Sequence, residues 1–247
     1  MPRQLGAFMF LGYLDDTART RKKIPLYQVL STVLIHESLF EHIETYVGLC
    51  VRDFVPKEKL EEFKEFHACE LYGGYDFFEG IEQRKRFEVI SNLLKPIAKF
   101  NIPIIYGAVD LKRLREQPYA SANPIDMAFR RCLTGVSEFM ARQETPAPGP
   151  VPEIALLIAD DCDPKIKATL RASFRQLRTH FRPPHFDVGL FRVHDDMYFG
   201  SSQDSIGLQI ADLCGYFIGK HLEKDQAAEG FYEMFKDQIV YSQIDPE

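Results

Sequence analysis

Four acidic positions in this sequence lie where apolar segments meet polar ones. The positions are Asp15 with Asp16, Glu70, Asp160 with Asp161, and Asp212. The first pair ends the run FMFLGYL, the second pair ends IALLIA, and Asp212 lies within SIGLQIADLCGYFIG. A carboxylate buried without a partner is unstable unless it becomes protonated or finds a cation. Several such positions along one chain therefore predict a shared cation site assembled by the fold.

Carboxylates of this kind suit hard divalent cations. Magnesium and manganese prefer oxygen ligands and retain several waters. Two such ions about 4 Å apart can activate a water and stabilise the leaving oxygen of a phosphodiester. Such a site draws its acids from separate strands and helices. We therefore expect the catalytic and metal-binding residues to be Asp15, Glu70, Asp160 and Asp212, with Mg or Mn as the cofactor.

Two further residues share helix faces with these acids. Gln209 lies three residues before Asp212, and His67 lies three residues before Glu70. Side chains three apart lie on one face of a helix. Gln209 is expected to support the site by holding a water, a phosphate or a carboxylate. His67 is expected to act as a ligand, a proton carrier or a partner of a ligand, and a purely structural histidine is the alternative.

Basic residues supply candidate phosphate contacts. The segment RTRKK follows the first acidic pair, and it predicts phosphate binding by Arg19, Lys22 and Lys23. A second set has spacings of three or four and predicts a basic helix face: Arg171, Arg175, Arg178 and Arg182. A solvated surface is the alternative for that face. The net charge of −6 counts mildly against a nucleic-acid partner, although bound cations would offset part of it.

The composition is that of a globular protein of 247 residues, with 45% hydrophobic and 27% charged residues. No apolar run reaches the roughly 18–20 residues of a membrane span, and the N-terminus lacks a signal-peptide pattern. The five cysteines are scattered and form no C-x-x-C pair, which favours reduced thiols. We therefore expect a cytoplasmic protein with no membrane association. Cys162 lies near the acidic residues in the sequence. It is expected to be either a reactive thiol or a small half-buried side chain.

Strands and helices alternate along the sequence. The pattern predicts strands at residues 7–14, 27–36, 102–109 and 153–159, and a strand or extended segment at 185–193. It predicts helices at 39–49, 57–68, 82–100, 124–142 and 163–181, and from Asp204 or Ser205 to about Glu223. The tail after Gln226 suits a short helix. This order favours an α/β fold with a mixed sheet flanked by helices. The proline-rich segment 145–152 is expected to be a surface loop inside one domain.

The acidic segments resemble the family catalogued as domain of unknown function 3800 (DUF3800), whose fold is similar to ribonuclease H. The matching segments are YLDDTA, FHACEL, LLIADD and SSQDSIGLQIADLCGY, in that order over about residues 8–222. The most specific part is G-L-Q-x-A-D-L. The resemblance implies one ribonuclease H-like domain over residues 1–247, with helical insertions, a core at about 7–223 and a tail at 224–247.

The resemblance also implies roles for the acidic residues. Similar folds serve two-metal nucleases and related transposase or resolvase cores. Asp15 would be the acid of the first strand, Glu70 a helix acid, Asp160 the acid of a later strand, and Asp212 the acid of the final helix. Asp16 and Asp161 would be secondary metal ligands. Many relatives carry Glu where this chain has Asp16, which leaves open whether Asp16 binds metal or caps a turn.

Two hypotheses follow. The first is a Mg- or Mn-dependent nuclease, a hydrolase that acts on the phosphodiester bonds of RNA or DNA. The alternative is a non-catalytic interaction or regulatory protein of ribonuclease H-like fold, in which the acids form a buried network or hold one structural ion.

Overall fold

A six-stranded mixed sheet forms the centre of the protein. In the computed structural model, the described residues are 9–16, 25–143, 153–180 and 190–246. The sheet order is β5-β4-β1-β2-β3-β6. The strands are β1 (Met9–Asp16), β2 (Tyr27–His36), β3 (Ile104–Asp110), β4 (Ile154–Asp160), β5 (Val193–Gly200) and β6 (Ile239–Asp245). The pairs β1–β2 and β2–β3 are antiparallel, and β1–β4, β4–β5 and β3–β6 are parallel.

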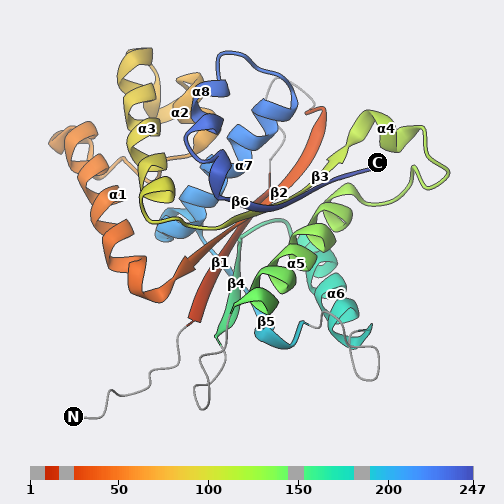
Figure 1. Ribbon diagram of the computed structural model, residues 1–247. Coiled ribbons are helices and arrows are strands. Elements are labelled where there is room, and N and C mark those ends of the chain that lie inside the picture. The colour runs from red at the N-terminus through yellow and green to blue at the C-terminus, as the bar shows by residue number, and fades with distance from the viewer. Residues whose placement is uncertain (1–8, 17–24, 144–152, 181–189, 247) are drawn as a thin grey trace, which may run out of the picture.

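Helices cover both faces of the sheet (Figure 1). One face is covered by α1 (Phe40–Phe54), α2 (Ala68–Gly73), α3 (Gln83–Lys99), α7 (Ile206–Leu222) and α8 (Glu229–Glu233). The other face is covered by α4 (Leu111–Arg115), α5 (Pro124–Arg142) and α6 (Pro164–His180). Two apolar cores result, one on each side. The predicted α/β class, a mixed sheet flanked by helices, is confirmed by this arrangement.

Local signals account for several element boundaries. Asn123 caps α5 by accepting a hydrogen bond from the backbone N–H of Ile125, and Pro124 occupies the first helical position. Ser205 caps α7 by accepting a bond from the N–H of Leu208. The predicted strand 27–36 and helix 124–142 match β2 and α5. Among the described residues, no helix is both long and apolar enough to cross a membrane.

Two predictions of secondary structure were wrong, and a third was confirmed but incomplete. Residues 57–68 form only a short 3-10 turn, Lys57–Lys59, before α2 begins. The late strand is Val193–Gly200 rather than 185–193, and residues 185–189 lie outside the described part. The tail does contain the short helix α8, but residues 239–245 form β6, which pairs with β3 at the edge of the sheet.

Candidate active site

Asp15 and Asp160 lie side by side at one end of the sheet. Leu14 of β1 is paired in parallel register with Ala159 of β4, so the following residues are Asp15 and Asp160. Adjacent strands are about 4.8 Å apart. Side chains alternate between the faces of a strand, and Tyr13 and Ile158 both pack in the core beneath α7. Asp15 and Asp160 therefore emerge on the α7 side of the sheet.

Small residues bring α7, with Asp212, against these strands. A Cβ atom on Gly207 would collide with the ring of Tyr13, and a Cβ on Gly215 would lie 2.9 Å from Ser31 Oγ. Ser31 lies opposite Asp15 in the β1–β2 register, and its hydroxyl donates to the carbonyl of Ala211 at 3.0 Å. Asp212 is the next residue on the helix. The predicted acids of β1, β4 and α7 therefore converge.

The pKa shifts of these acids also reflect their proximity. Burial raises the pKa of Asp15 well above its ordinary value, and the charges of Asp212, Asp16 and Asp160 raise it further. Burial also raises the pKa of Asp212 to about 6, against the opposing effects of His67 and the Ala68 N–H. The pKa of Asp160 is raised by burial as well. Ionised together, these carboxylates repel one another, which is the condition that a bound cation relieves.

Backbone N–H groups hold the three carboxylates in place. Asp160 Oδ1 accepts a hydrogen bond from Ser202 N at 3.1 Å, and Asp212 Oδ2 accepts one from Ala68 N at 2.7 Å. Asp15 Oδ1 accepts a bond from the N–H of Asp16 at 2.8 Å. Each of these bonds fixes one oxygen of a carboxylate. The orientation of the site therefore depends on the loop before α7 and on the start of α2.

Gln209 connects those two segments. Its Oε1 accepts a bond from Phe66 N at 3.3 Å, and its Nε2 donates to the carbonyl of Ser202 at 2.8 Å. The side chain is buried, with 8% of its surface exposed. The bonds of Gln209 differ from those predicted: they join the backbone groups of Phe66 and Ser202, and not a neighbouring carboxylate. A supporting role for Gln209 stays a prediction.

His67 lies at the start of α2, close to the acids. Its Nδ1 is 3.2 Å from the Cys69 Sγ. This contact, opposed by burial and assisted by the charges of Asp212 and Glu70, raises the pKa of His67 to about 10. The imidazole is therefore protonated at neutral pH. In this state it supplies a positive charge beside the carboxylates, and binding of a metal to this ring would require release of the proton. Glu70 lies on α2, half-buried and close enough to influence His67.

Asp16 points to the other face of the sheet, as strand alternation requires. It accepts a hydrogen bond from Gln28 Nε2 at 3.0 Å, and burial raises its pKa. It lines a small recess together with Asp15, Asp160 and Cys162. Burial and the charges of Asp16 and Asp160 raise the pKa of Cys162 to about 11. This thiol is therefore neutral at physiological pH, and a neutral thiol is a poor nucleophile.

Asp161 has a different environment from Asp160. It is exposed and forms an ion pair with Lys167 of α6. The N-terminus of α6 is capped instead by Asp163, which accepts a bond from Lys165 N at 2.8 Å. The predicted phosphate-binding residues Arg19, Lys22 and Lys23 lie outside the described residues, as does Arg182. Arg178 donates to the carbonyls of Val193 and His194, so it connects α6 to β5.

The donor set suits magnesium or manganese, because carboxylate oxygens are their preferred protein ligands. Within the described residues, however, no three His, Cys, Asp or Glu side chains are grouped so as to enclose a metal ion. Magnesium is usually held by one or two carboxylates together with waters and substrate phosphates. Asp15 on β1 and Asp160 on β4, with Asp212 beside them, match a site in which two carboxylates and waters bind the ion.

Comparisons with known proteins give a fold similarity alone. No family model matches the chain, and no curated protein matches it. The similar solved structures include Bst-RNase HIII in complex with Mn²⁺ (13% identity) and a mutant of the same protein (15% identity), each with a TM-score of 0.47. Each alignment covers 92% of this chain and 57% of the other, so the chain spans little more than half the length of those proteins. Similarities of this degree support no assignment of superfamily or activity.

Proposed function

We propose that this protein is a Mg- or Mn-dependent nuclease that hydrolyses phosphodiester bonds in nucleic acid, and that it belongs to the DUF3800 family. The observation that carries the proposal is the meeting of Asp15, Asp160 and Asp212 at one end of the sheet, where burial and mutual repulsion raise the pKa of Asp15. Carboxylates in such an arrangement are stabilised by divalent cations. The chemical class follows from the preference of these ions for phosphate and carboxylate oxygens.

Each residue has a distinct role in the proposed site. Asp15 and Asp160 would hold the metal together with waters and substrate phosphates, Asp212 would add negative charge beside them, and Glu70, Asp16 and Asp161 would be outer acids. When bound, the metal would activate a water and neutralise charge on the phosphate. Asp160 and Asp212 are oriented by the N–H groups of Ser202 and Ala68. His67 would place a positive charge beside the carboxylates and near an incoming phosphate.

One observation favours the non-catalytic alternative. Asp212 Oδ2 accepts the Ala68 N–H and Gln209 accepts the Phe66 N–H, so both polar residues of the G-L-Q-x-A-D-L segment hold the chain before α2. A purely structural network would use the same bonds. The two proposals differ in whether the carboxylates bind a divalent ion with measurable affinity.

The test combines metal binding with cleavage. Mn²⁺ and Mg²⁺ are titrated into the protein by calorimetry, and fluorescent RNA, DNA and RNA–DNA hybrid are tested as substrates. Asp15→Asn and Asp212→Asn should each reduce cleavage by more than the roughly 10–100-fold typical of a change to a residue that only supports a ligand. Each variant should also weaken metal binding, because it removes a negative charge from the site.

Asp53→Asn is the matched control, since Asp53 is an exposed aspartate on α1. It should leave both measurements unchanged. Wild-type protein that binds neither ion, or cleavage that survives in Asp212→Asn, would contradict the nuclease proposal. Metal binding without cleavage of any substrate would support the non-catalytic alternative.

A further inference from the structure

A basic face runs along α6, on the sheet face opposite α7, and it begins near Asp160 at the end of β4. Lys167, Arg171 and Arg175 are spaced four residues apart, so they lie along one side of the helix. Arg171 and Arg175 are exposed, and Lys167 is half-buried. Among the described residues, no carboxylate forms an ion pair with Arg171 or Arg175. Their charges are therefore available to an anionic partner.

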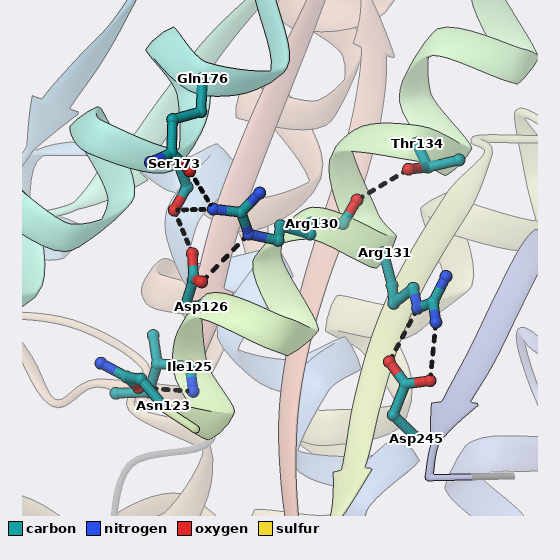
Figure 2. A network of polar contacts seen from close by, with 9 residues as sticks. All are labelled: Asn123, Ile125, Asp126, Arg130, Arg131, Thr134, Ser173, Gln176 and Asp245. Atoms are coloured by element: carbon teal, nitrogen blue, oxygen red, sulfur yellow. Dashed lines mark hydrogen bonds and ion pairs between the residues drawn. The ribbon is translucent and has the colours of Figure 1, made fainter. Parts of the chain in front are cut away.

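The orientation of α6 is fixed by contacts on its inner side (Figure 2). Arg130 of α5 donates to Gln176 Oε1 at 2.5 Å and to Ser173 Oγ at 3.3 Å, and Ser173 donates to Asp126. The apolar residues Leu170 and Phe174 are buried beneath the helix. Because the inner side is anchored in this way, the basic face stays at the surface next to β5.

Phe199 of β5 preorganises two of the cations. The guanidinium carbon of Arg171 lies 4.9 Å from the centroid of the Phe199 ring, and Lys167 Nζ lies 5.6 Å from it. A guanidinium that packs on a ring keeps its N–H donors free to bind a phosphate in bidentate fashion. Since the ring restricts the side chain before binding, less conformational entropy is lost when an anion binds.

The basic face begins at the acidic site. Lys167 forms an ion pair with Asp161, which directly follows Asp160. From Lys167 to Arg175 the helix advances roughly 12 Å, at about 1.5 Å per residue. This length corresponds to about three steps of a nucleic-acid strand at roughly 3.4 Å each. A strand bound along α6 would therefore reach the end of the sheet at which Asp160 lies, next to the start of the helix.

We propose that the face formed by Lys167, Arg171 and Arg175 binds the phosphate backbone of a nucleic-acid strand and directs it to the acidic site. Delivery of the strand to the acidic site rests on the proposed nuclease function. Binding of the strand to the basic face needs no metal. The net charge of −6 opposes unspecific attraction of the whole protein to anionic surfaces. Binding of a polyanion therefore depends on a local, regularly spaced set of cations.

The test measures binding without cleavage. A fluorescein-labelled single-stranded 20-mer and a hairpin duplex are titrated in EDTA, and fluorescence anisotropy is followed at several salt concentrations. Arg171→Gln/Arg175→Gln should weaken binding of the preferred form about 10–30-fold near 0.15 M salt, and should lower the slope of log K against log salt by about 1.4–1.8. The two oligonucleotides distinguish a single strand from a duplex.

Arg84→Gln/Lys85→Gln is the matched control, because both residues are exposed at the start of α3, on the opposite face of the sheet. The control should keep wild-type affinity and slope, and circular dichroism checks that both variants fold. Equal loss in both variants, no loss in the α6 variant, or binding to phosphatidylserine vesicles in place of oligonucleotides would each overturn the proposal. Oligonucleotide binding that depends on α6 in a protein without nuclease activity would support this surface and contradict the proposed function alone.

Discussion

Asp212 combines a buried position, a backbone hydrogen bond and two acidic neighbours. Burial raises its pKa to about 6, while the Ala68 N–H and His67 favour its ionised form. The raised value shows that burial outweighs both of those favourable contacts. In the absence of a bound cation, ionisation of this residue therefore costs stability at neutral pH.

The pH dependence of stability follows from this shift. A group whose pKa rises from 3.8 to about 6 on folding stabilises the folded state below pH 4, and that contribution is lost as the pH rises through 6. Asp212→Asn removes the ionisation and keeps an oxygen for Ala68. In EDTA, the variant should match wild type at pH 4 and melt about 6–12 °C higher at pH 7.5.

Differential scanning calorimetry at both pH values checks this, with Asp53→Asn as the control for simple loss of an exposed negative charge. Added Mn²⁺ should close the gap at pH 7.5 by stabilising wild type alone. A wild-type advantage that grows with pH in EDTA would show that the Asp212 carboxylate is stabilised by its surroundings, contrary to the raised pKa.

Helix α7 owes its position to the absence of side chains at two of its residues. Gly207 faces Tyr13 of β1 and Gly215 faces Ser31 of β2, with Ala211 between them. The four-residue spacing of Gly207, Ala211 and Gly215 is visible in the sequence, and it is the signal that could have predicted this close packing. The packing places Asp212 against the strand that carries Asp15.

Adding a methyl group at Gly207 should disturb that packing. We expect Gly207→Ala to lower the free energy of unfolding by about 1–3 kcal/mol, because its Cβ would overlap the Tyr13 ring. Gly48 provides a control within α1, where a Cβ would meet nothing within 4 Å. Gly48→Ala should instead stabilise the protein by up to about 1 kcal/mol. Urea unfolding of both variants measures the difference, and equal effects would exclude close packing as the cause.

The wrongly predicted helix at 57–68 shows how a tertiary contact overrides a local pattern. The N–H groups of Phe66 and Ala68 bond to the side chains of Gln209 and Asp212, which lie 143 and 144 residues further along the chain. Phe63 and Phe66 pack edge to face, with ring centroids 4.9 Å apart. These contacts favour an extended approach to α2, and nothing in the local sequence of charged residues indicates them.

At the scale of the molecule, the C-terminal strand completes the sheet. β6 pairs with β3, and Asp245 at its end forms a two-point ion pair with Arg131 of α5, at 2.7 and 2.9 Å (Figure 2). The Asp245 side chain is 9% exposed and that of Arg131 is 39% exposed. Two residues 114 positions apart in the chain are thereby joined beside the core beneath α5.

Breaking this pair should destabilise the whole fold. Arg131→Ala leaves the charge of Asp245 buried without its partner, so we expect a loss of about 2–4 kcal/mol in the free energy of unfolding. Arg142→Ala removes the exposed pair with Glu138 on the same helix and should cost less than about 1 kcal/mol. Chemical denaturation compares the two. A similar small cost in both variants would show that Asp245 is solvated without Arg131.

Local sequence signals are sufficient to predict most of the elements that carry the candidate acids. Asn123 and Pro124 define the start of α5, and β-branched residues mark β2 as a buried strand. The apolar runs before Asp15 and Asp160 place both acids at strand ends. These are short-range properties, which depend on backbone preference and on burial of neighbouring side chains.

Which acids meet depends on tertiary packing. The β1–β4 register places Asp15 beside Asp160, while alternation along β1 turns Asp16 towards Gln28 on the other face. Close packing at Gly207 and Gly215 then adds Asp212. Strand register and helix docking join residues that are far apart in the chain, so their energies come from long-range packing that no local pattern of the sequence contains.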